Sequence, residues 1–268
     1  VNFTPTDDSV YEGNETATIA ISGVSGADAT ESGSQSVSVT ITENESAPTV
    51  TLTVSATSIA ENAGSSITVT ATLSGATDEN VTVGLSTSGT ATEGTDYTDG
   101  SGVVDDITIS AGSTTGTVNF TPTDDSVYEG NETAILSISS VSGGSATESG
   151  SQSKTITITD NESAPTVTLA TSATSIAENA GSSLTLTATL SVATTADVTV
   201  ALSTSGTATE GTDYTDGSGN VDDIVISAGS TTGTVSFTPT DDSIYDATSN
   251  ETATIAVSGV SGGSATES

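Results

Sequence analysis

The feature that most constrains this chain is that it repeats itself at a spacing of 117 residues. The run Phe-Thr-Pro-Thr-Asp-Asp-Ser begins at Phe3, Phe120 and Phe237, and Gly-Thr-Ala-Thr-Glu-Gly-Thr-Asp-Tyr begins at Gly89 and Gly206. A repeat of this length is much longer than a solenoid unit and has the size of a whole small domain. Whatever one repeat folds into, the chain therefore contains it more than once.

The joints between repeats coincide with Ser-Ala-Pro at 46–48 and at 163–165. We therefore predict a complete repeat at 48–163, preceded at 1–47 by the back part of a repeat and followed at 164–268 by a repeat without its last strand. The first 47 residues hold few large apolar side chains and should not bury a core alone. Either the chain is an excerpt from a longer array, or half-repeats of two molecules complete one another by strand exchange.

Alternation of apolar and polar residues predicts the strands of the complete repeat. The predicted strands are 50–55, 66–74, 80–87, 104–109, 115–120, 132–140 and 153–159. In the second of these, Ile67, Val69, Ala71 and Leu73 face inward, and the threonines between them face water. Seven half-apolar strands predict an all-β fold, an immunoglobulin-like antiparallel sandwich of two sheets. We also expect the three repeated phenylalanines to lie in the core.

The acidic residues of the complete repeat concentrate at one end of this sandwich. Consecutive strands run in opposite directions, so the loops after the first, third and fifth strands share an end with the tail of the seventh. This acidic end holds twelve of the repeat's fifteen acidic residues: Glu61, Glu93, Asp96, Asp99, Asp105, Asp106, Asp124, Asp125, Glu129, Glu132, Asp160 and Glu162. Such segregation argues against an evenly solvated acidic surface.

The composition excludes most other chemistry. The chain has 35 acidic residues, one basic residue and no histidine or cysteine, which excludes an imidazole base, a thiol nucleophile and a Cys/His zinc site. Its charge opposes binding of nucleic acid and anionic lipid, and no apolar run is long enough to span a membrane. No feature raises the pKa of one carboxyl selectively, so we do not predict an enzyme. Crowded carboxylates without a basic partner must bind protons or cations, and Ca²⁺, with 6–8 oxygen ligands, fits them better than Mg²⁺.

Four segments of the repeat resemble the Calx-beta domain. They are Ala-Glu-Asn at 60–62, the Gly-Thr-Ala-Thr-Glu-Gly-Thr-Asp-Tyr run at 89–97, Asp-Asp-Ser-Val-Tyr-Glu-Gly-Asn-Glu at 124–132 and Thr-Ile-Thr-Asp-Asn-Glu at 157–162. This module is found in sodium–calcium exchangers, in some integrin subunits and in many large bacterial surface proteins. The resemblance covers the whole repeat.

The resemblance implies that these segments supply calcium ligands at one end of the sandwich. In the complete repeat the implied ligands are Glu61, Asp96, Asp124, Asp125, Glu129, Glu132, Asp160, Glu162 and a backbone carbonyl near Val127. In the third repeat they are Glu178, Asp213, Asp241, Asp242, Asp246 and Glu251. In the first they are Asp7, Asp8, Glu12, Glu15, Glu43 and Glu45. The third site is expected to be incomplete, because the terminal Asp-Asn-Glu is missing and a two-residue insertion follows Asp246.

These observations lead to one main functional hypothesis and two alternatives. The main hypothesis is a calcium-binding spacer of a secreted or cell-surface rod, in which Ca²⁺ bound at 160–162 stiffens the joint between repeats. Its partners would be calcium ions, neighbouring repeats and other copies in an adhesive or matrix filament. The alternatives are a calcium-dependent module that recognises a ligand or carbohydrate, and a calcium-sensing regulatory domain. Near-identical repeats favour the spacer, because a recognition tip is usually unique.

Overall fold

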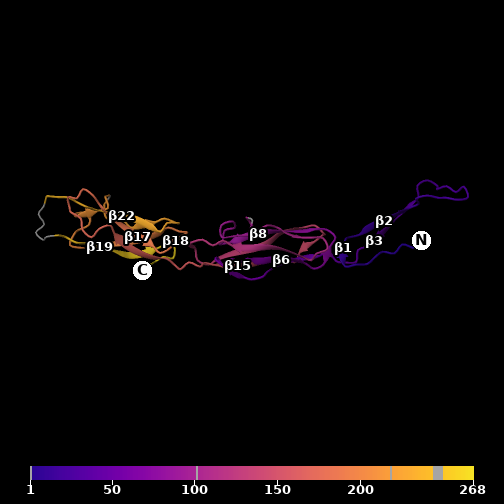
Figure 1. Ribbon diagram of the computed structural model, residues 1–268, viewed down its shortest axis with the longest axis horizontal. Coiled ribbons are helices and arrows are strands. Elements are labelled where there is room, and N and C mark those ends of the chain that lie inside the picture. Colours follow the sequence, from indigo (N-terminus) through magenta and orange to yellow (C-terminus); the bar gives the residue numbers. More distant parts are fainter. Residues whose placement is uncertain (1, 101, 218, 244–249) are drawn as a thin grey trace. The chain divides into compact units, whose positions relative to one another are not determined.

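The computed structural model describes residues 2–100, 102–217, 219–243 and 250–268, which form strands, turns and loops. Figure 1 shows the strands in chain order. In the first segment, the strands are β1 (Val10–Tyr11), β2 (Glu15–Ala20) and β3 (Ser36–Ile41). β2 and β3 form a two-stranded antiparallel sheet.

The middle repeat is a sandwich of two five-stranded sheets. One sheet has the order β10-β8-β13-β15-β5 and the other has the order β14-β4-β6-β11-β9. The strands are β4 (Thr49–Val54), β5 (Ser58–Ala60), β6 (Ile67–Leu73), β7 (Ala76–Thr77), β8 (Val81–Gly89), β9 (Tyr97–Thr98), β10 (Ile107–Ile109), β11 (Thr115–Pro122), β12 (Val127–Tyr128), β13 (Glu132–Ser142), β14 (Thr147–Glu148) and β15 (Ser153–Thr159). All seven predicted strands are confirmed, and five short strands join them.

The core of the middle repeat follows from the alternation in its sequence. In β6, Ile67, Val69, Ala71 and Leu73 are buried, while the residues between them are half-buried. Phe120 is fully buried, and its ring stacks on that of Tyr97 with centroids 4.5 Å apart. The predicted strand at 104–109 begins only at Ile107, because the residues before it belong to a hydrogen-bonded loop.

The third repeat has the same plan with fewer strands in one sheet. Its sheets have the orders β20-β22-β17-β16-β24 and β21-β19-β23. The strands are β16 (Thr166–Thr171), β17 (Leu184–Leu190), β18 (Ala193–Thr194), β19 (Val198–Gly206), β20 (Tyr214–Thr215), β21 (Ile224–Ile226), β22 (Thr232–Pro239), β23 (Ala253–Ser261) and β24 (Thr266–Glu267). Among the described residues, the β21-β19-β23 sheet has no counterparts of β15 and β5.

The expectation that all three repeated phenylalanines lie in the core is wrong for Phe3, which is 44% exposed. Phe120 and Phe237 each stack on a tyrosine that stands 23 positions earlier, Tyr97 and Tyr214 respectively. No such tyrosine stacks on Phe3 among the described residues. Phe237 is half-buried and packs against the core of the third repeat.

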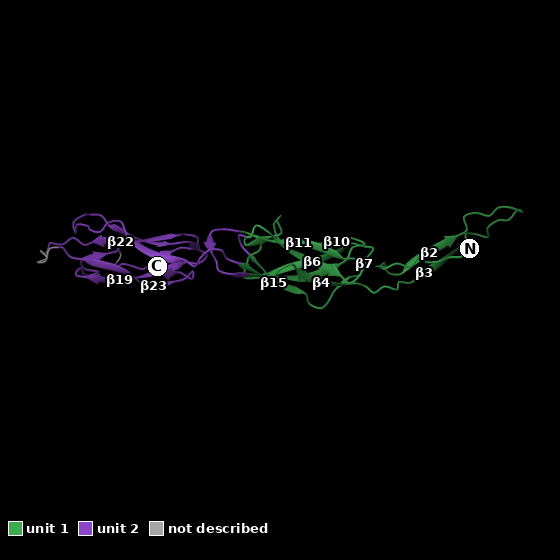
Figure 2. Ribbon diagram, turned by 60° about the horizontal axis from the view of Figure 1, so that its bottom comes forward, with its two compact units in different colours: residues 1–59, 63–123, 133–158 green, residues 60–62, 124–132, 159–268 purple. Residues whose placement is uncertain are grey.

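Packing of the backbone divides the chain into two compact units (Figure 2). One unit comprises 1–59, 63–123 and 133–158, and the other comprises 60–62, 124–132 and 159–268. The loop segments 60–62 and 124–132 of the middle repeat therefore belong to the same unit as the third repeat. The domain boundaries at 47/48 and 163/164 stay a prediction.

Candidate metal centre at the acidic end

Three acidic side chains of the middle repeat converge where two neighbouring strands end. Glu61 follows β5, and Asp160 and Glu162 follow β15. The two strands are adjacent in their sheet, and the Glu61 N–H donates to the Thr159 carbonyl at 3.0 Å. One carboxylate oxygen from each acid lies within 4.8 Å of the others. We call Glu61, Asp160 and Glu162 the Glu61 cluster.

The Glu61 cluster also holds the loop at 124–130 in place. Glu61 is only 6% exposed, and its Oε1 accepts the backbone N–H of Asp125 at 2.9 Å. Asp160 Oδ2 accepts the N–H groups of Glu129 at 2.8 Å and Gly130 at 2.5 Å. Because these bonds fix the carboxylates from several sides, the cluster is a built feature of the fold rather than a set of freely rotating surface acids.

The pKa values within the cluster diverge for physical reasons. Burial, together with the charges of Asp125 and Asp160, raises the pKa of Glu61 above its usual range. Burial, the Asp160 carboxyl and the charge of Glu61 raise the pKa of Glu162. Burial also disfavours ionisation of Asp160, but backbone N–H donors led by that of Glu162 outweigh it and lower its pKa. Simultaneous ionisation of all three carboxyl groups is therefore unfavourable unless a cation is present.

The donor set fits a hard divalent cation. Every side chain in the cluster offers oxygen, which Ca²⁺ prefers. Glu162 Oε2 is buried and has no hydrogen-bond partner among the described residues. The chain's one basic residue, Lys154, stands six residues before Asp160 along an extended strand, a separation of about 20 Å. The cluster therefore has an open acceptor and no neutralising side chain.

Three other ligands that the resemblance implies for the middle repeat are Asp96, Glu129 and Glu132. The Asp96 carboxylate also accepts the N–H of Thr92 at 2.5 Å, which closes its own turn. Its loop starts at Gly89, whose φ of +122° and closeness to the Thr133 carbonyl leave no room for a side chain. Glu129 has a half-buried side chain, as do Asp96 and Glu132.

The remaining implied ligands of the middle repeat lie in the same loop as Glu129. Asp124 and Asp125 are exposed, and Asp125 Oδ1 accepts the N–H of Val127 at 2.7 Å. Val127 belongs to β12, which forms a short parallel pair with β18 of the third repeat. This pairing was not predictable from the sequence, because two-residue strands give no alternation signal. Glu93 was also predicted to lie at the acidic end. Its carboxylate accepts the Thr87 hydroxyl and the Val104 N–H, and it thus connects β8 to the loop before β10.

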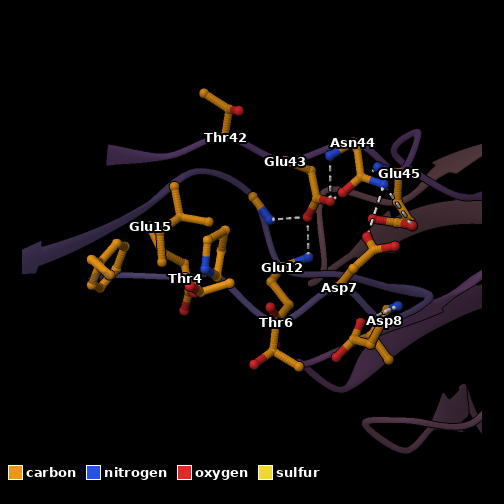
Figure 3. Close-up of a pocket in the computed structure, with 15 residues that line it drawn as sticks. Thr4, Thr6, Asp7, Asp8, Glu12, Glu15, Thr42, Glu43, Asn44 and Glu45 are labelled. Carbon is orange, nitrogen blue, oxygen red and sulfur yellow. Dashed lines mark hydrogen bonds between the residues drawn. The ribbon is translucent and has the colours of Figure 1, made fainter. Parts of the chain in front are cut away.

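The first segment carries a matching arrangement around Glu43, which occupies the position of Asp160 (Figure 3). Glu43 Oε2 accepts the N–H groups of Glu12 at 2.6 Å and Gly13 at 2.8 Å. Hydrogen bonds from the backbone of Glu45, then of Glu12, lower the pKa of Glu43 to about 2. Asp7 lies nearby and accepts the Asn44 side-chain amide at 3.3 Å. The other implied ligands of this segment, Asp8 and Glu15, are exposed.

In the third repeat the corresponding carboxylates are more open. Glu178 is exposed, although its Oε1 accepts the Asp242 N–H at 3.1 Å as Glu61 accepts that of Asp125. Asp213 accepts the Thr209 N–H at 2.6 Å. Asp241 and Glu251 are exposed, and Asp246 lies outside the described residues. No group of three acids within 4.8 Å is found in this repeat among the residues that the structure describes.

Comparisons with known proteins identify the family. The Calx-beta domain model matches residues 43–162 and 160–265. Solved structures with a related fold include CBD12 from CALX1.2 (21% identity, 70% of this chain and 74% of that chain covered, TM-score 0.36). Others are calcium binding domain CBD12 of CALX1.1 (19%, 76% and 77%, TM-score 0.34) and a two-domain protein of unknown function from Bacteroides fragilis (11%, 72% and 84%, TM-score 0.31).

A search of curated proteins found no match. No helix among the described residues is long and apolar enough to cross a membrane. The solved structures add nothing to the assignment, because their TM-scores are low, and the family match alone carries it. The match covers most of the sequence in two consecutive segments. The chain therefore belongs to the Calx-beta family of calcium-binding, non-catalytic modules and carries two of them in tandem.

Proposed function

We propose that this chain is a calcium-binding structural segment whose acidic ends bind Ca²⁺ and thereby stiffen the joints between repeats. The observation that carries the proposal is the Glu61 cluster, in which three carboxylates meet and the buried Glu162 Oε2 lacks a hydrogen-bond partner among the described residues. Family membership supports calcium as the cation. When bound, Ca²⁺ supplies the positive charge that the cluster's own residues do not.

The ligand set that we propose for the middle repeat has two parts. Glu61, Asp160 and Glu162 form the first part, and Asp96, Glu129 and Glu132 are proposed as the second. Asp124, Asp125 and the Val127 carbonyl complete the proposed set. The weaker counterparts in the first segment and in the third repeat are proposed to bind Ca²⁺ less tightly, because each lacks some of these elements within this chain.

The structural role follows from where the cluster stands in the chain. Asp160 and Glu162 lie directly between β15 and β16, so the residues that hold the cation also form the connection to the third repeat. A cation held by this connection and by loops of the middle repeat restricts the connection. We further propose that the chain is extracellular or at the cell surface, acts as a spacer in an adhesive or matrix filament, and has no catalytic activity of its own. Proposed domain boundaries are 1–47, 48–163 and 164–268.

Calorimetry and hydrodynamics on the whole 268-residue chain test this proposal. Titration with Ca²⁺ should release or absorb heat with saturation, and Mg²⁺ at the same concentration should bind more weakly. Calcium should also raise the melting temperature of the middle repeat. It should narrow the distribution of end-to-end distances of the chain, which small-angle X-ray scattering measures, and EGTA should reverse both effects. Unchanged melting and unchanged scattering in EGTA and in Ca²⁺ would refute the proposal.

A further inference from the structure

The acidic loops of the first segment and of the middle repeat each carry a two-residue strand that pairs with the following repeat. β1 pairs in parallel with β7, with Val10 opposite Ala76 and Tyr11 opposite Thr77. β12 pairs with β18 in the same way, with Val127 opposite Ala193 and Tyr128 opposite Thr194. Each pair lies inside one compact unit. The same joint is therefore formed twice, from the same residue types.

Carboxylates of the acidic end clamp this strand on both sides. Before the strand, Asp125 Oδ1 accepts the N–H of Val127 at 2.7 Å. After the strand, Asp160 Oδ2 accepts the N–H of Glu129 at 2.8 Å. In the first segment, Asp8 and Glu43 make the corresponding bonds to Val10 and Glu12 at 2.8 and 2.6 Å. The conformation of the strand thus depends on acids that belong to the proposed cation site.

In each joint, the strand that pairs with the Val-Tyr strand contains a buried threonine. We call this threonine, together with the residues that surround it, the threonine socket. Thr77 is 1% exposed, its hydroxyl donates to the Glu79 carbonyl at 2.6 Å, and its own carbonyl accepts the Gly112 N–H at 2.7 Å. A Cβ on Gly144 would lie 2.7 Å from the Thr77 side chain. A side chain at position 144 would therefore collide with Thr77.

The second socket repeats this construction. Thr194 is 1% exposed, donates to the Ala196 carbonyl at 2.7 Å and accepts the Gly229 N–H at 2.8 Å. Gly263 stands where Gly144 stands in the first socket. The three residues after the threonine differ completely, Asp-Glu-Asn at 78–80 and Thr-Ala-Asp at 195–197, while Ala-Thr is retained. The retained residues are those that build the socket.

We infer that the Val-Tyr strand and the threonine socket form the contact through which cation binding at one acidic end fixes the next repeat. The inference rests on the proposed function and names the partner surface of that site. A short backbone pair without support is weak, so its formation is sensitive to whether the clamping acids are held in place. A cation that orders Asp8 and Glu43, or Asp125 and Asp160, also orders the strand that they clamp.

The backbone N–H of Asp78 reports on the first joint, because it donates to the Tyr11 carbonyl at 3.3 Å across that joint. Hydrogen exchange of this amide is to be measured by NMR on the whole chain in Ca²⁺ and in EGTA. We expect Ca²⁺ to slow the exchange by about tenfold or more. If the amide exchanges equally in both buffers while calorimetry shows calcium binding, the inference is overturned and the proposed function survives. If calorimetry shows no calcium binding at all, the proposed function fails and the inference fails with it.

The Gly144→Ala variant tests the socket itself, with Gly150→Ala as the matched control. Both glycines have positive φ, +51° and +69°, but only Gly144 faces the threonine, and nothing lies within 4 Å of a Cβ on Gly150. In Gly144→Ala, calcium should still bind but should no longer slow exchange at Asp78, whereas Gly150→Ala should behave as the parent chain. Slowing retained in Gly144→Ala, or lost equally in the control, overturns the inference.

A second variant, Val10→Pro, covers the case in which Gly144→Ala does not fold. Proline at position 10 removes the N–H that Asp8 accepts. Val10 itself is not part of the core of the middle repeat. This variant should lose the calcium-dependent slowing at Asp78 while the melting temperature of the middle repeat stays unchanged. Persistence of the slowing contradicts the role of the clamped strand.

Discussion

Neutralising one carboxylate of the Glu61 cluster should stabilise the middle repeat without calcium and reduce the extra stability that calcium confers. In Glu61→Gln, the amide oxygen can still accept the Asp125 N–H, so the loop at 124–130 keeps its anchor. What changes is the charge, from three carboxylates within 4.8 Å to two. At an effective dielectric of about 20, each pair at that separation repels by roughly 3 kcal/mol before further screening. The substitution removes two of the three pairs.

Burial and neighbouring charges raise the pKa of Glu61 because they destabilise its ionised form, and solvent screens part of the repulsion between the carboxylates. We therefore expect a net gain of only about 1–2 kcal/mol in EGTA, which corresponds to a melting temperature about 4–8 °C higher for a domain of this size. In saturating Ca²⁺ weaker calcium binding offsets this gain. A tenfold weaker affinity costs about 1.4 kcal/mol of ligand stabilisation, and the loss of one charged ligand should be at least that large.

Differential scanning calorimetry of the whole chain in EGTA and in excess Ca²⁺ measures both effects. The control is Glu148→Gln in the short strand β14, where the carboxylate accepts the Gln152 N–H at 2.5 Å. β14 pairs with the start of β4, at the opposite end of the strands. The control should leave the calcium-dependent rise in melting temperature unchanged. The reasoning is refuted if Glu61→Gln lowers the melting temperature in EGTA, or if its calcium-dependent rise equals that of the parent chain.

Three further predictions concern pH, the core and the loop that carries Asp96. In calcium-free buffer the raised pKa values of Glu61 and Glu162 mean that the folded state binds protons more tightly than the unfolded state. Stability should therefore rise as pH falls from neutrality to 4.5, and the lowered pKa of Asp160 should reverse the trend at lower pH. Urea unfolding at several pH values checks the sign. Phe120→Ala should cost about 3–5 kcal/mol, because a fully buried ring is lost, while the exposed Phe3→Ala should change stability by no more than about 0.5 kcal/mol in the same unfolding assay. Gly89→Ala should cost about 1–3 kcal/mol and weaken calcium binding in calorimetry, because its Cβ would lie 2.1 Å from the Thr133 carbonyl, and an unchanged affinity would contradict the positioning role of this turn.

The sandwich was predictable because its strands are long enough to show alternation. In β6, four apolar residues at every second position are all buried, and their period alone identifies the inward face. The convergence of Glu61 with Asp160 was also accessible, since strand direction places both at one end. Phe3 was misassigned because a repeated motif predicts its environment only where the partner of the motif is present, and its tyrosine partner has no counterpart in this chain.

The joint between repeats was not predictable from the sequence. A two-residue strand such as Val127–Tyr128 has no period, and the pairing with Ala193–Thr194 joins residues about half a repeat apart without any local signal. The burial of Thr77 is equally unexpected, because the threonines of longer strands such as β6 alternate with apolar residues and are less buried. Only the glycines at 112 and 144, whose backbones approach that threonine, hint at its surroundings.

Comparison of Glu61 with Glu178 shows which part of the fold completes the acidic cluster. The two residues stand in the same seven-residue sequence, and both accept the N–H of an aspartate from the same loop. Yet Glu61 is buried and Glu178 is exposed. The difference lies in β15, which pairs beside β5 and brings Asp160 to Glu61; the counterpart of β5 in the third repeat, 175–177, is not a strand. Since the last strand of the sandwich supplies both the closing backbone and two of the three acids, cation binding and attachment of that strand stabilise each other.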